Sequence, residues 1–211
     1  MIRKIMEASD FVDLSHKDSG PDFYNKWASN YDAQYKNTMK YTGYKHVSSK
    51  WRSYHKELGS DSIEKIFDAG CGTGLVGEDL VTLVPRNLIE IYGGDLSPGM
   101  LAIARAKNVY ADLRVVNLKE ELPYEADYFD SVLCAGVFTE GHCGPECLPN
   151  LIRVLKKGRY LFATVRLDLY NDETKPEWER QVKDCNCELI EDTEMPYREG
   201  AKCAVVVVRK L

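Results

Sequence analysis

The sequence lacks any long apolar run, any strong excess of charge of one sign and any low-complexity stretch. No apolar segment approaches the roughly 20 residues that span a membrane, and Met1-Ile-Arg-Lys is not followed by the apolar core of a signal peptide. The net charge is −5, with acidic and basic residues mixed, whereas nucleic-acid binding needs a basic face to collect phosphates. We therefore expect a cytoplasmic protein without membrane or nucleic-acid partners.

Paired cysteine motifs are also missing. The seven cysteines are odd in number, and a cytoplasmic chain keeps its thiols reduced. The sequence contains no Cys-x-x-Cys pair of the zinc-binding kind and no Pro-Cys pair of the kind used by pyrimidine-methylating nucleophiles. We expect no bound metal, and we interpret Cys134 and Cys203 as small core residues of strands.

The most informative segment covers residues 63 to 74, Ile-Glu-Lys-Ile-Phe-Asp-Ala-Gly-Cys-Gly-Thr-Gly. An apolar run ends in Asp68, and glycines then alternate until a helical pattern begins at Leu75. Glycine permits positive φ and lets a ligand lie against bare main chain, while the first N–H groups of the helix face the same space. The pattern predicts a strand, a tight turn and a helix that hold a cofactor. The turn contains Gly70, Cys71, Gly72 and Gly74.

Two cofactor classes fit this turn. The stretch from Gly72 to Gly77 matches G-x-G-x-x-G, the dinucleotide fingerprint, and Asp95 follows at a plausible distance to hold a ribose. However, Asp68 would repel a pyrophosphate, whereas it suits a ligand that carries an ammonium and a sulfonium. A Tyr-x-x-x-Lys pair occurs over residues 41–45, but short-chain dehydrogenases place this pair well after the turn. Both points favour the sulfonium ligand.

Strands and helices continue to alternate after the turn. A second strand is predicted over residues 89–95, and Ser97 and Pro98 supply the N-cap and first position of the next helix. Further strands are predicted over residues 113–118, 128–134, 160–165, 187–195 and 202–209. Further helices are predicted over residues 175–184 and from Gly144 to a C-terminus formed by Lys156, Lys157 and Gly158. The last two strands must pair antiparallel because no helix separates them.

This series resembles the motifs of class I S-adenosylmethionine-dependent methyltransferases and, within them, the Williams–Beuren-region methyltransferase-like proteins. The resemblance rests on Asp-Ala-Gly-Cys-Gly-Thr-Gly, Asp-Leu-Ser-Pro-Gly-Met, Leu-Pro-Tyr with Phe-Asp-Ser-Val-Leu, and Ile-Arg-Val-Leu-Lys-Lys-Gly-Arg-Tyr, in that order. It implies a Rossmann-like α/β fold with helices on both faces of a mostly parallel seven-stranded sheet whose last strand is antiparallel. The implied cofactor is S-adenosylmethionine, and its product is S-adenosylhomocysteine.

The resemblance also assigns cofactor contacts. The glycine turn surrounds the amino-acid portion, Asp68 organises its ammonium through water, and Asp95 accepts hydrogen bonds from the ribose hydroxyls. The remaining contacts are Leu96 and Leu118 with the adenine ring, Asn117 with its amino group, and Cys134 and Ala135 with the methionine portion. Asn117 departs from the Asp that the family often has, but its amide carbonyl can accept the same bond.

Residues 21–60 are predicted to form a helical lid that precedes a Rossmann-like core over residues 61–211 of one methyltransferase domain. Residues 1–20 are expected to be a loose arm or a short capping helix. The first lid helix carries Trp27 and Tyr31, as in related enzymes that fold an aromatic helix over the cofactor. Aromatic faces attract a sulfonium by roughly 0.5–2 kcal/mol, although this spacing is also typical of simple core. We expect one of the pair to touch cofactor and the other to pack.

The sequence carries fewer signs of the methyl acceptor. Residues 134–142 lack the Asn/Asp-Pro-Pro-Tyr signature of adenine- and glutamine-methylating enzymes. His142 is a candidate general base because its reference pKa is about 6.5, and Glu140 is a candidate contact for a cationic acceptor; both have a solvated loop as the alternative. We expect a small-molecule acceptor rather than a protein side chain, and no oligomer is indicated. A noncatalytic binder of S-adenosylmethionine or S-adenosylhomocysteine is the second hypothesis.

Overall fold

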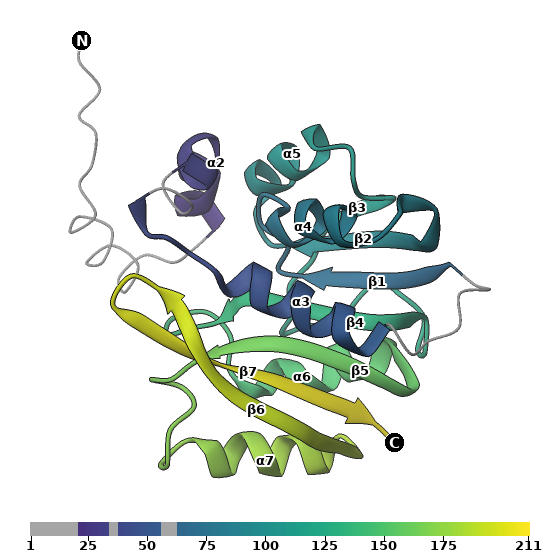
Figure 1. The fold of residues 1–211 in the computed structure, drawn as a ribbon, viewed down its shortest axis with the longest axis vertical. Helices are drawn as coiled ribbons and strands as arrows, with labels where there is room; N and C mark the ends of the chain where they lie inside the picture. Colours follow the sequence, from purple (N-terminus) through teal and green to yellow (C-terminus); the bar gives the residue numbers. More distant parts are fainter. Residues whose placement is uncertain (1–20, 34–37, 56–62) are drawn as a thin grey trace.

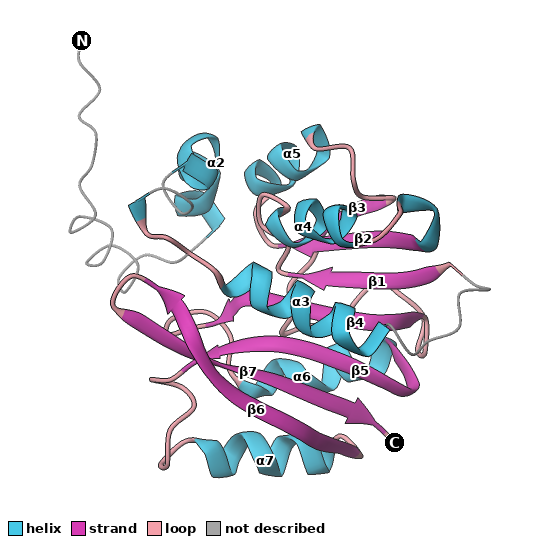
Figure 2. Cartoon of the chain, viewed as in Figure 1, coloured by secondary structure: helices cyan, strands magenta, loops and turns pink. Residues whose placement is uncertain are grey.

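The computed structural model describes residues 21–33, 38–55 and 63–211, drawn in colour in Figure 1. The expected N-terminal arm over residues 1–20 lies outside these residues, as do residues 34–37 and 56–60 of the predicted helical lid. Secondary structure is shown in Figure 2, where a twisted sheet runs through the centre of the described chain and helices lie on both of its sides.

The central sheet has seven strands in the order β3-β2-β1-β4-β5-β7-β6. Neighbouring strands from β3 to β5 pair in parallel, whereas β7 is antiparallel to both β5 and β6. The mostly parallel sheet with an antiparallel last strand is therefore confirmed. The strands are β1 (Glu64–Ala69), β2 (Ile89–Asp95), β3 (Asp112–Val115), β4 (Phe129–Phe138), β5 (Leu155–Arg166), β6 (Cys187–Arg198) and β7 (Ala201–Lys210).

Helices cover both faces of the sheet. Successive side chains of a strand point to opposite faces, and both faces carry apolar side chains that the helices bury. Ile66 packs in a core with α3 and α4, whereas its neighbour Phe67 packs in a second core with α6 and α7. None of the described helices is both long and apolar enough to cross a membrane. The helices are α2 (Pro21–Ala33), α3 (Gly43–His55), α4 (Leu75–Leu83), α5 (Pro98–Ala106), α6 (Leu148–Val154) and α7 (Lys175–Asp184), with single 3₁₀ turns at Arg86–Leu88 and Pro145–Cys147.

The predicted helix from Gly144 to Gly158 starts at the expected place, with Gly144 as N-cap and Pro145 as the first residue, but its C-terminal end is wrong. It begins with the 3₁₀ turn and ends at Val154, and the residues expected to close it already belong to β5. Leu155 is fully buried and pairs with Phe129 of β4, so long-range pairing overrides the local C-cap chemistry. Lys156 extends to Asp130 at 2.8 Å instead of capping the helix.

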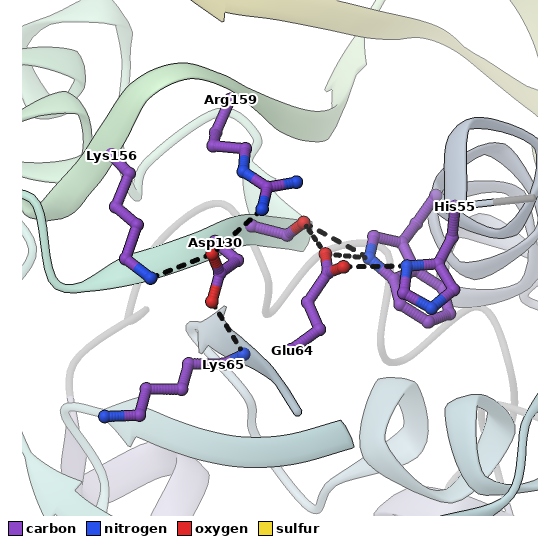
Figure 3. Close-up of polar contacts among 8 residues, drawn as sticks. His55, Glu64, Lys65, Asp130, Lys156 and Arg159 are labelled. Carbon is purple, nitrogen blue, oxygen red and sulfur yellow. Dashed lines mark hydrogen bonds and ion pairs between the residues drawn. The ribbon is translucent and has the colours of Figure 1, made fainter. Parts of the chain in front are cut away.

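Buried acidic groups fix the amino end of the sheet, opposite the glycine turn (Figure 3). Asp130 accepts the backbone N–H of Lys65 at 3.1 Å and lies 3.2 Å from Arg159 as well as bonding Lys156. Glu64 lies nearby, 2.7 Å from Nδ1 of His55. These contacts stabilise the strand ends remote from the predicted cofactor turn.

Candidate functional site

The glycine turn lies at the carboxyl end of β1 and leads directly into α4. Gly70, Gly72 and Gly74 all have positive φ, of 69°, 53° and 88°. A Cβ at Gly70 would lie 2.1 Å from a methyl group of Val137, so packing requires glycine there. A Cβ at Gly72 would meet no atom within 4 Å. Gly72 thus borders open space in which a ligand can lie against the main chain.

Packing inside the protein accounts for two glycines of the G-x-G-x-x-G motif. The ring of Tyr110 occupies the space beside Gly74 and Gly77, where added Cβ atoms would come within 2.9 Å and 2.6 Å of it. The same ring lies 3.0 Å from the Cβ position of Gly93 on β2. Glycines of the turn, of α4 and of β2 therefore surround one half-buried tyrosine. Packing against Tyr110 therefore accounts for the glycine at position 77, and a bound pyrophosphate is not needed to explain it.

Asp68 is the last but one residue of β1, beneath the turn, and has no exposed surface. Tyr110 Oη donates a hydrogen bond of 2.7 Å to Asp68 Oδ2 and accepts one of 3.3 Å from the Gly77 N–H. Asp68 Oδ1 is buried and has no hydrogen-bond partner among the described residues. Burial raises the pKa of Asp68 to about 7, although the Tyr110 bond opposes this rise. The unpartnered oxygen suits a hydrogen-bond donor from a ligand.

Asp95 lies at the end of β2, next to the glycine turn. Its two oxygens accept the backbone N–H groups of Gly72 and Ser97, each at 2.8 Å. Burial raises the pKa of Asp95, and these two backbone bonds counteract it. A carboxylate oxygen has a second lone pair, so both oxygens can still accept a ligand hydroxyl. Leu96 follows with 47% of its surface exposed, which provides an apolar platform beside Asp95.

Asn117 and Leu118 follow β3, which ends at Val115, so the predicted strand over 113–118 is too long. Asn117 Oδ1 accepts the Lys119 N–H at 3.1 Å, and this side-chain turn ends the strand. The Asn117 amide also donates to Glu120 at 2.9 Å. Leu118 is buried, with its side chain 3.9 Å from the Cβ position of Gly70. The structure therefore brings this loop against the turn.

Strand β4 extends to Phe138, beyond its predicted end at Cys134, and is irregular between these two residues. Cys134 is fully buried, which raises the pKa of its thiol well above the usual range. Ala135 is half-buried, and Gly136 follows with φ of 80°. The side chain of Cys134 belongs to the core, so any ligand contact here falls on the exposed part of the strand end.

Helix α2 contacts the loops that follow β2 and β1. Asn25 Oδ1 accepts hydrogen bonds from Ser97 Oγ at 2.7 Å and from the Gly99 N–H at 2.8 Å. Seven residues later, on the same helical face, Asp32 accepts a hydrogen bond from the hydroxyl of Thr73 inside the glycine turn. Figure 1 shows α2 beside α5 at the end of the sheet toward which β1 points. The helix therefore spans the edge that carries the site.

Of the two aromatic residues predicted for cofactor contact, Tyr31 is half-buried on α2, whereas the side chain of Trp27 lies outside what the structure describes. The sequence analysis missed Tyr24, Asn25, Asp32 and Tyr110. The spacing of Asn25 and Asp32, two short polar side chains on one face of an aromatic helix, is a signal that could have identified them. Tyr110 carries no comparable signal.

His142 lies in the loop after β4 and is half-buried. Its Nε2 is 2.7 Å from Tyr24 Oη of α2, and its Nδ1 is 2.6 Å from Thr139 Oγ1. Burial lowers the pKa of His142, which favours the neutral ring. Glu140, two residues earlier, is exposed. The two candidate catalytic residues therefore have different environments, because His142 is half-buried and Glu140 is exposed.

The sheet order, the glycine turn after β1 and the acidic residues at the ends of β1 and β2 define the architecture of a class I methyltransferase. Residues 67–163 match a family model described as a methyltransferase domain. Human methyltransferase-like protein 27 is 30% identical over 154 residues, which make up 72% of this chain and 60% of that protein. Together with the fold, these two similarities support a class I S-adenosylmethionine-dependent methyltransferase.

Further comparisons give a second relative and two solved structures with the same fold. A Geobacillus sp. protein named as a methyltransferase is 30% identical over 94 residues, or 43% of this chain and 36% of that protein. This chain thus spans less than two thirds of either relative. A chain of a Haloferax volcanii complex between the Trm112 methyltransferase activator and a methyltransferase has a TM-score of 0.66 at 17% identity, covering 89% and 98% of the two chains. Synechocystis magnesium protoporphyrin IX methyltransferase with bound S-adenosylhomocysteine scores 0.60 at 14% identity, covering 80% and 84%.

Proposed function

We propose that this chain binds S-adenosylmethionine over the glycine turn and transfers its methyl group to a small-molecule acceptor by in-line displacement. The observation that carries the proposal is the open space at Gly72, where a Cβ would meet nothing within 4 Å. Asp95 borders this space because its carboxylate bonds the Gly72 N–H at 2.8 Å. The two similarities to methyltransferases support the same cofactor.

The residues around the turn divide the work of binding. Asp95 accepts the ribose hydroxyls through its remaining lone pairs, and the unpartnered oxygen of Asp68 faces the ammonium. Exposed Leu96 lies against the adenine ring, with Asn117 at its amino group. Bound S-adenosylmethionine supplies a methyl group that is already activated by the sulfonium, so no metal or covalent relay is needed. Holding the acceptor in line contributes up to roughly 7–11 kcal/mol.

His142 is the proposed general base. Its lowered pKa keeps the ring neutral near pH 7, as a proton acceptor must be. Because Tyr24 Oη already bonds Nε2 at 2.7 Å, the acceptor's proton reaches His142 by way of this hydroxyl. Tyr24 belongs to α2, which we interpret as the lid. The contact of α2 with His142 thus completes the proton route and helps to exclude water.

Calorimetry with the purified chain tests the cofactor assignment. We expect S-adenosylhomocysteine and S-adenosylmethionine to bind and nicotinamide adenine dinucleotide to give no heat of binding. Binding of the dinucleotide alone would refute the methyltransferase proposal. The predicted absence of nucleic acid, membrane and oligomer partners and the cytoplasmic location remain part of this proposal.

The alternative function is noncatalytic binding of the same cofactor, and calorimetry does not separate the two. The chain is therefore incubated with methyl-labelled S-adenosylmethionine and a small-molecule metabolite extract, and the labelled product is identified by mass spectrometry. Labelled product that disappears with the Gly72→Val variant supports transfer at this site. Tight cofactor binding without any labelled product supports the noncatalytic binder.

A further inference from the structure

Asp68 presents an unusual problem of charge. Its carboxyl group is fully buried, one oxygen bonds the phenol of Tyr110, and the other oxygen has no hydrogen-bond partner in the described part of the chain. No ion pair joins Asp68 to a described basic residue. An ionised carboxylate in such a place is costly, because burial without a compensating positive charge removes its hydration.

The charged and titratable groups around Asp68 do not compensate it. Lys107, which caps the C-terminus of α5, lies close enough to act on it, but its ammonium is bonded to Asp32 at 2.7 Å and lies 3.4 Å from Glu78. Asp95 of β2 adds negative charge. Burial raises the pKa of the Cys71 thiol, of the Cys134 thiol and of the Tyr110 phenol well above their usual ranges, so these groups stay neutral.

We propose that Asp68 and Tyr110 form a proton-coupled receptor for the ammonium of the cofactor, in which Asp68 gives up a proton to solvent as the ammonium binds. This inference rests on the proposed function. In the step, the O–H bond of the Asp68 carboxylic acid breaks and the proton leaves to water. The ammonium then donates a hydrogen bond to the carboxylate, and nothing is oxidised or reduced. Tyr110 is a positioning residue that holds the carboxylate.

The proposal predicts how affinity depends on pH. Since the pKa of Asp68 is about 7, the carboxyl group is mostly protonated below that pH and must ionise to receive the ammonium. The affinity for S-adenosylhomocysteine should therefore rise about tenfold per pH unit up to pH 7 and become flat above it. About one proton should be released per ligand bound at pH 6, and almost none at pH 8.5.

The experiment is calorimetry of the full chain with S-adenosylhomocysteine between pH 5.5 and 8.5, in buffers of different ionisation enthalpy, which yields the number of protons released. 5′-Methylthioadenosine is the comparison ligand, because it keeps the adenine, ribose and sulfur but lacks the ammonium. Proton release with S-adenosylhomocysteine alone supports the proposal. Equal release with both ligands would assign the titration to Asp95 at the ribose and overturn the proposal.

Variants of Asp68 and Tyr110 test whether these residues act on ligand binding or only maintain the packing. Asp68→Asn should bind S-adenosylhomocysteine more weakly and remove the pH dependence. Tyr110→Phe keeps the ring that fills the space beside the glycines but loses the bond to Asp68, so the midpoint of the pH profile should move up by roughly one unit. Tyr170→Phe is the matched control, because Tyr170 also donates to a carboxylate, that of Asp192 at 2.9 Å, outside the site. Its profile should match the wild type.

The outcomes remain distinct from those of the proposed function. A chain that binds S-adenosylhomocysteine with the same affinity across the pH range refutes the proton coupling and leaves methyl transfer standing. An unshifted midpoint in a folded Tyr110→Phe variant refutes the role of Tyr110. A chain that binds neither S-adenosylhomocysteine nor 5′-methylthioadenosine refutes the proposed function itself.

Discussion

Replacement of Gly72 by valine isolates the open space over the turn from the rest of the fold. The Cβ of the valine would meet no atom within 4 Å, so packing does not exclude the side chain at its point of attachment. It would instead occupy the space assigned to the cofactor. We therefore expect the substitution to lower the affinity for the cofactor much more than the stability of the fold.

The backbone cost of this substitution can be estimated and controlled. Gly72 has φ of 53°, and an L-residue in the left-handed region costs roughly 1–2 kcal/mol. Gly200, in the turn between β6 and β7, has φ of 73° and equally open surroundings, so Gly200→Val carries the same strain away from the site. Both variants should lower the melting temperature by roughly 2–8 °C for a chain of this size.

Only Gly72→Val should lose the cofactor. We expect its dissociation constant for S-adenosylhomocysteine, measured by calorimetry, to rise at least 100-fold, which corresponds to about 2.8 kcal/mol. Gly200→Val should bind as the wild type does. If folded Gly72→Val keeps wild-type affinity, the cofactor does not lie against this turn, and the reasoning from open space to ligand is refuted.

Three further predictions follow from the site and its surroundings. Asp95→Ala should weaken S-adenosylhomocysteine binding at least tenfold by calorimetry, and unchanged affinity would place the ribose elsewhere. His142→Ala should slow formation of the labelled methyl product without altering S-adenosylhomocysteine affinity, whereas an unchanged rate would eliminate His142 as the base. Asp130→Ala, at the opposite edge of the sheet, should lower the free energy of unfolding by about 2–4 kcal/mol in urea titrations because Lys156 and Arg159 lose their buried partner. Weakened binding by this variant after refolding would contradict the separation of the two edges.

The part of the fold near the turn could be predicted because its signals are local. The apolar run of β1, the glycine spacing and the helical pattern of α4 follow one another within about 20 residues, and Ser97 caps α5 by bonding the Met100 N–H as its sequence predicts. The end of α6 could not be predicted this way. The pairing of Leu155 with Phe129 joins residues 26 positions apart in the chain and overrides the lysines and glycine that suggest a helix end.

The same distinction separates the predicted from the missed site residues. Asp68 and Asp95 could be proposed from the sequence because each lies at the end of a strand that leads into a turn, and this position directs a side chain to the carboxyl edge of the sheet. Tyr110 and Asp32 act on the turn across 33 to 42 positions of sequence. A single sequence contains no pattern that joins such distant residues, so only the folded chain shows the contacts.

Gly77 shows why a motif needs its structural cause. By spacing alone it completes a dinucleotide fingerprint, and the charge of Asp68 was the argument against that interpretation. The structure gives an independent reason, because a Cβ at Gly77 would come within 2.6 Å of the Tyr110 ring inside the protein. The third glycine therefore serves the tyrosine that holds Asp68 and does not face a phosphate. Gly77, which completes the apparent dinucleotide motif, thus belongs to the packing that positions the carboxylate of Asp68. This carboxylate favours a ligand with an ammonium over one with a pyrophosphate.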